Sequence, residues 1–312
     1  MAFTQHRIHL KEQQRGADAT TWGQLLLHVP GLLCSLAVIA SVSYLLLPGV
    51  GWLPPVLWLA SGALVFYRPA ESFFARYVLG MRYPTRQERD RLAPVWKEVT
   101  ARAGVDGRTY ELWIEDSDAL NAYAAAGHIV GVTRFSLDHL PNGQLAAVLA
   151  HELGHHTGGH AWSSLLGYWY ALPGRLTWWA LRSVARFALL VTRRISVAAT
   201  GLLFLLIGMP LVFLTFSVWY LVVPLLLAPY LLAAVGRRAE LRADQHAAAL
   251  GFASMLSEVL TTMHTGEKAA EAAALRAGHS ARRPGLLVQL LSTHPDYYTR
   301  LRHLEPYLRP RG

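Results

Sequence analysis

His151-Glu152-Leu153-Gly154-His155 is the stretch that decides how this sequence is interpreted. On a helix, residues four positions apart share a face, so the imidazoles of His151 and His155 can bind one metal ion. Glu152 is offset by one position, which lets it hold a water beside the metal without being a ligand. A catalytic zinc site keeps three protein ligands and one open position. The motif therefore predicts a zinc hydrolase whose third ligand lies elsewhere in the chain.

The classes of zinc peptidase differ in the origin of this third ligand. A metzincin carries a histidine six residues after the second histidine of the motif and a glycine three residues after it. Gly158 fits this spacing, but position 161 is alanine, and the nearest imidazole, His160, comes one residue early. The sequence therefore lacks the simple metzincin pattern. His156 and His160 form a second pair four residues apart, but no glutamate follows His156, which favours structural roles for both.

A glutamate on a later helix, followed one turn on by an aspartate, is the alternative source of the third ligand. Glu240 and Asp244 have this spacing and would share one helix face. In this interpretation Glu240 is the third metal ligand. Asp244 then accepts the outer N–H of a ligand histidine, expected to be His151, and fixes its tautomer. The other interpretation is a solvated helix face on which both carboxylates lie near arginines.

Long uncharged tracts indicate the class of protein. The chain has 312 residues, of which 53% are hydrophobic and 16% are charged, whereas the usual charged share is about 25%. Its mean hydropathy is +0.26. Residues 19–67 and 195–236 contain no Asp, Glu, Lys or Arg. Since one crossing takes about 20 residues, each tract is long enough for two, which predicts a multi-pass membrane protein.

The apolar tracts divide at turn-forming residues. The first divides at Pro48-Gly49-Val50-Gly51 into 25–47 and 52–67, and the second has its clearest break at Gly208-Met209-Pro210. The first run is too long for a signal peptide. A third apolar stretch, 161–180, is rich in Trp and Tyr and is expected to form a helix at the membrane interface or packed against the spans.

Basic residues gather at the ends of the apolar tracts and account for much of the net charge of +9. They are Arg7, Lys11, Arg15, Arg68, Arg76, Arg82, Arg182, Arg186, Arg193, Arg194, Arg237, Arg238 and Arg242. This distribution predicts a cell-membrane protein with these flanks in the cytoplasm. No groove-reading or base-stacking motif accompanies the charge, so nucleic acid is not an expected partner. The lone Cys34 excludes a disulfide framework.

The expected fold is mainly α-helical and multi-pass, with a zinc peptidase domain that contains a small β-sheet and is split by a transmembrane hairpin. Residues 1–79 would form an N-terminal segment with a transmembrane hairpin, 80–160 the first half of the peptidase domain, 161–236 interfacial and transmembrane helices, and 237–312 the second half. An even number of crossings must separate the two halves if they are to share one metal. Two crossings in the second tract satisfy this condition.

Sequence patterns predict individual elements within the two halves. A helix at 83–105 is followed by a strand at 108–114, and strands at 121–126 and 128–133 form a hairpin around Gly127. The next helix starts after Leu140-Pro141-Asn142 and carries the metal motif. Further helices are expected at 237–250, 266–278, 283–291 and 296–308.

Four motifs occur in a fixed order along the chain. They are Asn121-Ala122-Tyr123-Ala124 followed by Gly127, Val148-Leu149-Ala150-His151-Glu152-Leu153-Gly154-His155-His156 with His160, Glu240-Leu241-Arg242-Ala243-Asp244, and Ser292-Thr293-His294-Pro295 with Arg300. In this combination the chain resembles the family of membrane zinc metallopeptidases that includes the bacterial heat-shock protease HtpX and the CAAX prenyl endopeptidases. The resemblance runs from near Tyr83 to the C-terminus.

The resemblance implies a gluzincin fold with one zinc per chain, at the cytoplasmic face of the membrane. It also implies that His294 and Arg300 stabilise the oxyanion, although Thr293-His294-Pro295 by itself fits a helix start equally well. Asn121 and Ala122 would belong to an edge strand that pairs with an extended substrate. The alternative is that Asn121 only begins a strand after a turn.

The predicted activity is hydrolysis of peptide bonds by a membrane-embedded endopeptidase. Zinc would lower the pKa of a water towards about 7, and Glu152 would act as general base. The expected partners are membrane-associated polypeptide substrates and the lipid bilayer. HtpX-like quality control is preferred to prenyl-protein processing, because nothing in the sequence shows a lipid-receiving chamber. A non-catalytic zinc-binding scaffold or sensor would not need Glu152, and a transporter would need buried charges that the spans lack.

Overall fold

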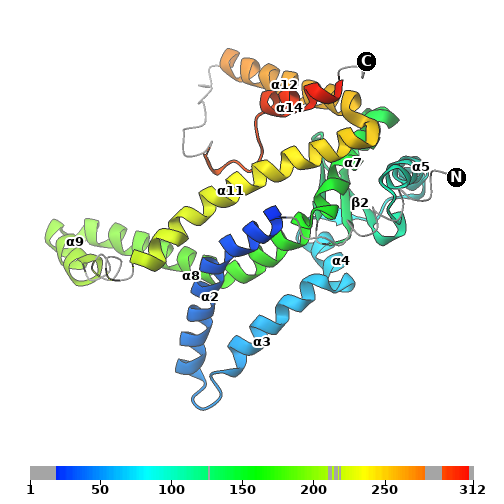
Figure 1. Ribbon diagram of the computed structural model, residues 1–312. Coiled ribbons are helices and arrows are strands. Elements are labelled where there is room, and N and C mark those ends of the chain that lie inside the picture. Colours follow the sequence, from blue (N-terminus) through cyan, green and yellow to red (C-terminus); the bar gives the residue numbers. More distant parts are fainter. Residues whose placement is uncertain are drawn as a thin grey trace. The chain divides into compact units, whose positions relative to one another are not determined.

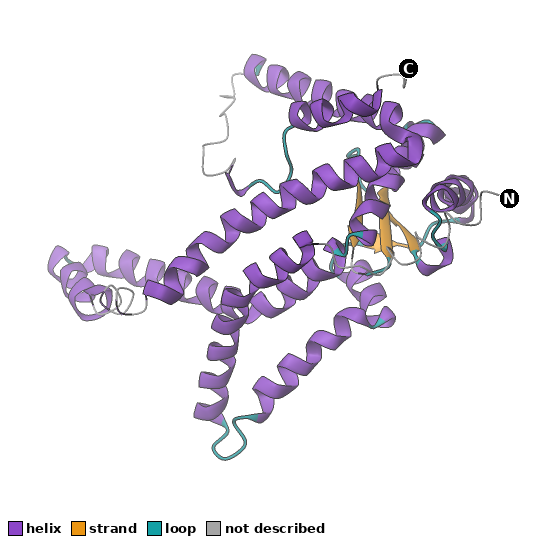
Figure 2. Cartoon of the chain, in the orientation of Figure 1, coloured by secondary structure: helices purple, strands orange, loops and turns teal. Residues whose placement is uncertain are grey.

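The computed structural model describes residues 19–125, 127–209, 213, 217, 219–277 and 290–308, which are mostly helical and include one four-stranded sheet (Figures 1 and 2). The chain forms two compact units. The first unit contains residues 1–24, 63–165 and 232–312, and the second contains residues 25–62 and 166–231. The sheet and the metal motif both belong to the first unit, which is built from three separate stretches of sequence.

The sheet consists of β1 (Met81–Arg82), β2 (Glu111–Glu115), β3 (Ala122–Ala125) and β4 (Ile129–Thr133) in the order β1-β2-β4-β3. β2 and β4 are parallel, and the other two pairs are antiparallel. The predicted hairpin is present, with Ala122 opposite Val132 and Ala125 opposite Ile129. β4 is buried at every position and β3 is the last strand of the order. β3 therefore keeps one open edge.

Two helices carry most of the packing around the sheet. α5 (Arg86–Ala103) begins with a capping box between Thr85 and Glu88 and ends at Gly104, whose φ of 68° suits glycine. α7 (Asn142–Thr157) carries the metal motif and contacts α5, β3 and β4. The buried core joins these helices to the sheet; its largest members include Leu92, Ile114, Leu145, Leu149, Leu153, Phe252, Leu260 and Leu304. Residues 145–153 of α7 are all buried, so packing on every side of the helix fixes the direction of its motif side chains.

The C-terminal part of the first unit is a helical run that folds back on α7. α11 (Trp219–Ala247) continues through a π-helical turn, η4 (Ala248–Phe252), into α12 (Ala253–Arg276), and Gly251 bends the chain there with a φ of 87°. α14 (Tyr297–Leu308) packs on α12. These helices include the ones predicted at 237–250, 266–278 and 296–308. The helix predicted at 283–291 lies, except for its last two residues, outside the described residues.

The N-terminal apolar tract forms helices on either side of a turn. α2 (Ala19–Leu46) is followed by α3 (Leu53–Ser61), the 3₁₀ turn η1 (Gly62–Phe66) and α4 (Arg68–Tyr77). Among the described residues, two helical segments are long and apolar enough to cross a membrane, namely Ala19–Leu46 and the 55-residue run Val222–Arg276. Leu53–Phe66 is apolar but shorter. Length and composition thus support membrane spans at both tracts.

The helix expected at 161–180 is present but is longer than predicted. α8 (His160–Ile195) is one helix of 36 residues that runs through Pro173 and several arginines. Residues 176–194 are rich in Leu, Ala and Arg, which favour helix, and no strong breaker separates them from the aromatic part. α9 (Val197–Leu203) and the π turn η3 (Phe204–Gly208) follow. Within the second unit α8 packs on α3, where the Tyr170 hydroxyl donates to the Leu59 carbonyl at 2.6 Å.

Candidate metal centre

Three potential ligand side chains converge between α7 and α11. Nε2 of His151 lies 3.3 Å from Nε2 of His155. The Glu240 carboxylate lies 3.3 Å from Nε2 of His155 and 3.6 Å from Nε2 of His151. All three side chains are at most 15% exposed. The structure therefore brings together the two histidines of the motif and a glutamate that lies 85 residues after His155.

These separations fit a tetrahedral zinc ion. Ligand atoms held at zinc bond lengths of about 2.0–2.2 Å lie about 3.3–3.6 Å apart. The 3.3 Å between the two imidazole nitrogens and the 3.3 Å from His155 to one Glu240 oxygen fall in this range, while His151 lies 3.6 Å from the other oxygen of that carboxylate. Two imidazole nitrogens that face each other at 3.3 Å also need a cation or a shared proton between them, because their lone pairs repel. The donor set and its spacing thus suit zinc, with Glu240 as the charged ligand.

The outer nitrogen of His151 is held by Asp244. Nδ1 of His151 lies 2.9 Å from a carboxylate oxygen of Asp244, which is fully buried. This contact leaves Nε2 directed towards His155 and Glu240. Burial would raise the pKa of Asp244, but hydrogen bonds from Arg300 and His151 hold the pKa below its usual value. The aspartate is therefore ionised and favours positive charge at the centre.

Arg300 on α14 is tied to the same carboxylates. Its Nε and one terminal nitrogen donate to the two oxygens of Asp244 at 2.8 and 2.6 Å, and its other terminal nitrogen lies 3.5 Å from Glu240. The residue is 9% exposed. A guanidinium held in this bidentate way has little freedom to turn towards a substrate. The contacts place Arg300 behind the metal ligands, where it can orient them.

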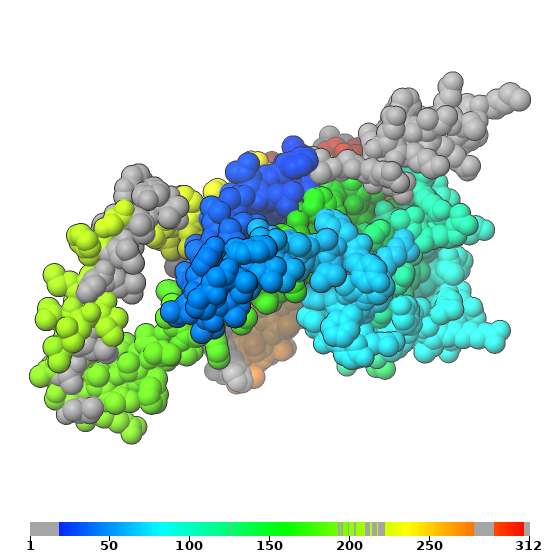
Figure 3. Space-filling model, turned by 90° about the horizontal axis from the view of Figure 1, so that it is seen from below, coloured from blue at the N-terminus to red at the C-terminus, as the bar shows by residue number. Residues whose placement is uncertain are grey.

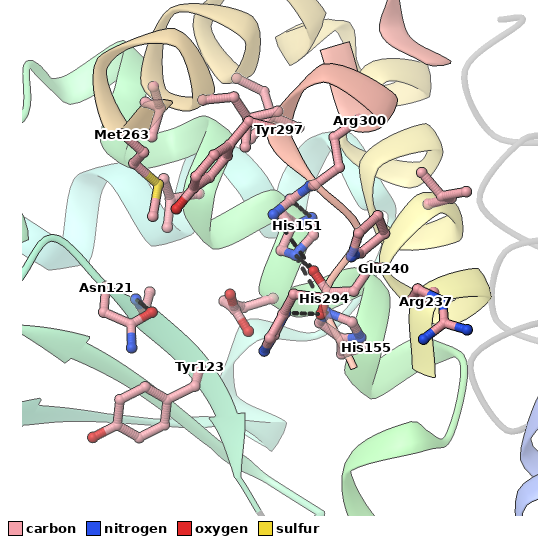
Figure 4. Close-up of a pocket in the computed structure, with 18 of the residues that line it drawn as sticks. Asn121, Tyr123, His151, His155, Arg237, Glu240, Met263, His294, Tyr297 and Arg300 are labelled. Carbon is pink, nitrogen blue, oxygen red and sulfur yellow. Dashed lines mark hydrogen bonds and ion pairs between the residues drawn. The ribbon is translucent and has the colours of Figure 1, made fainter. Parts of the chain in front are cut away.

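His294 lies on the open side of the same carboxylate. Its Nδ1 is 3.2 Å from an oxygen of Glu240, and its side chain is 70% exposed. The hydrogen bond to Glu240 raises the pKa of His294 above its ordinary value. Both residues expected to act on the oxyanion line the cleft (Figure 4), but the His294 side chain is 70% exposed and the Arg300 side chain only 11%.

Glu152 lines the cleft beside the ligand histidines. It is 6% exposed. Burial raises the pKa of its carboxyl, and the neighbouring charges of His151 and His155 partly offset this effect. A hydrogen bond from the backbone N–H of Ala124 on β3 also lowers the pKa. A carboxylate whose pKa is moved towards neutrality is a more effective general base than an exposed one.

The cleft between β3 and the helices α12 and α14 has a volume of about 1450 Å³. Asn121, Ala122 and Ala124 line the strand side, and Met263 and Tyr297 line the helical side (Figure 4). No sequence pattern indicated Met263 and Tyr297, because their position depends on α12 folding back over α7.

Backbone N–H and C=O groups on the open edge of β3 point towards this cleft. The Asn121 carbonyl accepts from the Thr133 N–H at 3.1 Å, so it points into the sheet. Since an antiparallel strand alternates, the backbone groups of Ala122 and Ala124 point outwards. The Asn121 side chain accepts from the Ala122 N–H at 3.0 Å. Asn121 comes just before β3 and Ala122 begins it, so both lie at the end of an edge strand that borders the cleft.

The second histidine pair lies apart from the ligand set. Nε2 of His156 donates to the Ile129 carbonyl at 2.8 Å, and burial lowers the pKa of His156 to about 4. His160 is bonded to Thr20 at 3.0 Å, and burial lowers its pKa to about 4 as well. Both histidines are neutral and bound to other parts of the unit. Their contacts are structural.

Comparison with known families identifies the chain. The family model described as Peptidase family M48 matches residues 86–308, which is well over half of the sequence. The chain belongs to peptidase family M48. M48 peptidases are metalloproteases, and His151, His155 and Glu240 form a group in this chain that could hold the metal.

A curated protein named "Protease HtpX homolog" from Dictyoglomus thermophilum is also similar to this M48 chain. The two sequences are 30% identical over 139 residues, which is 43% of this chain. The matched part spans 44% of that relative's length. Together with the two apolar helical segments, this similarity indicates a membrane protein of the HtpX type.

Proposed function

We propose that the chain is a zinc-dependent endopeptidase that hydrolyses peptide bonds at the cytoplasmic face of the membrane. The observation that carries the proposal is the convergence of His151, His155 and Glu240 beside Glu152, at the open edge of a β-strand. Metal-assisted peptide hydrolysis needs metal ligands, a general base and a surface that binds the substrate, and these residues supply all three. Membership of M48 supports this assignment.

The edge strand would bind the substrate in an extended conformation. The outward backbone groups of Ala122 and the Ala124 carbonyl can pair with a peptide, which adds a strand to the sheet. The Asn121 side chain, which accepts from the Ala122 N–H in the structure, would then bond the peptide instead. This arrangement needs no particular substrate side chain, so it suits an enzyme that cleaves unfolded segments of many polypeptides.

Zinc held by His151, His155 and Glu240 would act as a Lewis acid that activates a water and polarises the scissile carbonyl. Glu152 would take the proton of the attacking water and pass it to the leaving amine. His294 would donate to the oxyanion, since it lies at the cleft with an exposed ring. Asp244 would fix His151, and Arg300 would fix both carboxylates.

The bilayer would select the substrates. Two helical segments of sufficient length and apolar composition support an integral membrane protein, and basic residues at their ends favour a cytoplasmic position of the cleft. Polypeptides in or near the membrane would reach such a cleft first. The similarity to an HtpX homologue supports a protease of this type. We propose quality control of membrane proteins, rather than processing of prenylated proteins, as its role.

The direct test is the variant Glu152→Gln, purified with its metal. The amide keeps the size of the side chain but cannot accept the proton. We expect full zinc content and loss of cleavage of an unstructured protein such as casein. Unchanged cleavage would show that Glu152 is not the base, and a non-catalytic zinc protein would show no cleavage by the parent chain either.

A further inference from the structure

α4 (Arg68–Tyr77), in the first unit, has two faces of different character. Glu71 and Ala75, four residues apart, are 3% and 0% exposed. Phe73 and Tyr77, also four residues apart, are 61% and 68% exposed, and Val78 just after the helix is 60% exposed. An ordinary surface helix buries its aromatic side chains and exposes its carboxylates. α4 instead buries Glu71 and exposes Phe73 and Tyr77, while Phe74 is half-buried.

The buried face of α4 is fixed to the sheet by a charged side chain. One oxygen of Glu71 accepts from the Gly127 N–H at 3.3 Å, and both oxygens lie 3.2 Å from Nδ1 of His128. These residues form the turn between β3 and β4. A Cβ at Gly127 would lie 3.1 Å from Glu71, so the helix and the turn are in close contact. α4 therefore cannot rotate to bury its aromatic side chains without breaking this contact.

The exposed face combines aromatic and basic residues. The rings of Phe73 and Tyr77 lie 4.7 Å apart, and Tyr67, just before the helix, is 59% exposed. Arg68 and Arg76 are exposed beside them, although Arg68 also donates to the Thr109 carbonyl at 3.2 Å. Aromatic rings with arginines are the composition of the headgroup region of a bilayer, where rings reach the acyl boundary and guanidinium groups meet phosphates.

The position of α4 in the chain identifies the partner. The apolar helical segment Leu53–Phe66 ends one residue before Tyr67, so the exposed aromatic face begins where an apolar tract ends. A helix that directly follows an apolar segment in the bilayer begins near the membrane surface. Arg68 and Arg76 add an electrostatic attraction for anionic lipid.

We propose that the exposed face of α4 lies in the lipid–water interface, with Phe73, Tyr77 and Val78 among the headgroups and Arg68 and Arg76 bound to anionic lipid. Through Glu71, this interfacial helix holds the β3–β4 turn, and hence one end of the strand that borders the cleft. The membrane surface then determines how far the open edge of β3, where the substrate would bind, lies from the bilayer. This role goes beyond peptide hydrolysis and is independent of it.

Depth measurements on the full chain in nanodiscs test the proposal. Cys34 is the only cysteine, so a Cys34→Ser background allows single labelling. An environment-sensitive NBD label would be placed by Phe73→Cys, by Tyr77→Cys, and, as a matched control on an exposed helix of the same unit, by Lys97→Cys. Quenching by nitroxide-labelled lipid is compared with quenching by aqueous iodide. The label on native Cys34, in α2, reports insertion of the apolar tract.

We expect lipid nitroxide to quench the labels at 73 and 77 at least about twofold more than the label at 97, since an interfacial helix buries its apolar face about 5–10 Å into the headgroup–acyl boundary. The excess should be larger with anionic than with zwitterionic lipid, and the double variant Arg68→Gln/Arg76→Gln should remove this difference.

Two outcomes would overturn the proposal. In the first, lipid quenches the labels at 73 and 77 no more than the label at 97, while it does quench Cys34; the chain is then inserted but α4 is not at the surface. In the second, the labels at 73 and 77 are shielded from iodide but not quenched by lipid, which would mean that a protein surface covers this face. Because no cleavage is measured, the Glu152→Gln variant must give the same result as the parent.

Discussion

The carboxylate of Asp244 lies 2.9 Å from Nδ1 of His151, the nitrogen that is turned away from Glu240. This contact makes one helix responsible for two tasks. Glu240 faces the ion position, and Asp244, one turn later on α11, orients the histidine that shares the ion. The spacing of four residues is what allows a single helix face to do both.

Replacing Asp244 by asparagine should weaken metal binding. The amide has nearly the same size but loses the negative charge that holds His151 and Arg300. Loss of such an orienting partner reduces metal affinity by about 10–100-fold. Competition with a coloured zinc chelator measures this change, and Glu258→Gln, an exposed carboxylate on α12, serves as the control. Equal affinities for parent and Asp244→Asn would remove Asp244 from this role.

Gly154 should be required for the distance between the two ligand helices. A Cβ at Gly154 would lie 3.0 Å from the backbone Cα of Ala243, which sits between Glu240 and Asp244 on α11. Gly154→Ala should therefore push α7 from α11, destabilise the fold by about 1–3 kcal/mol and reduce metal affinity. On the same helix, the Cβ in Gly143→Ala meets only the flexible Met255 at 3.3 Å, so this control should keep its zinc. Full zinc affinity in Gly154→Ala would contradict the close contact.

Zinc content and kinetics should distinguish the role of Arg300, which orients the metal ligands, from that of His294, which donates to the oxyanion. Arg300→Lys keeps the charge but loses the bidentate geometry on Asp244, so zinc affinity should fall. His294→Ala should keep zinc and lower kcat by about 10²–10³-fold, as loss of an oxyanion donor does. The two readouts are zinc content and the steady-state kinetics of peptide cleavage. Should Arg300→Lys keep its zinc and lose only kcat, Arg300 would be the oxyanion donor instead.

The ion pair between Arg82 and Glu88 at the start of α5 should make the thermal stability of the fold depend on pH. The side-chain hydrogen bond from Arg82, at 2.7 Å, lowers the pKa of Glu88 from 4.5 to about 2. Because the folded pKa lies below the unfolded one, this stabilisation is complete above pH 4.5 and is lost as the pH falls towards 2. The Tm difference between parent and Glu88→Gln should therefore be larger at pH 6 than at pH 3.

A matched variant provides the control for this pH effect. Glu98 on the same helix pairs with Arg102 four residues on, and both side chains are exposed. Glu98→Gln should cost less than about 1 kcal/mol. A Tm difference for Glu88→Gln that stays constant from pH 6 to pH 3 would show that the Arg82 contact does not stabilise the fold.

The local parts of the fold could be predicted from the sequence because they depend on short-range spacing. The positions of His151 and His155 follow from helical periodicity, and the hairpin around Gly127 follows from alternation beside a glycine. Glu240 was preferred to a solvated helix face because a histidine pair precedes it, a zinc site needs a third ligand, and Asp244 follows one turn later. These elements are all present in the structure.

The long-range parts could not be predicted in the same way. The bond between Arg300 and Asp244 depends on α14 packing on α12, and nothing in the local sequence of either residue indicates the partner. The length of α8 was underestimated because a change from aromatic to basic composition does not end a helix. The exposed rings on α4 are recognised only once the buried position of Glu71 is known.

Metal analysis of the purified Glu240→Ala variant tests the central claim most directly. The account predicts about one zinc per chain in the parent, as two histidines and one glutamate share one ion. It predicts that zinc content falls strongly in Glu240→Ala while the variant stays folded by circular dichroism. Full zinc content in this variant would contradict the joint binding of one ion by α7 and α11.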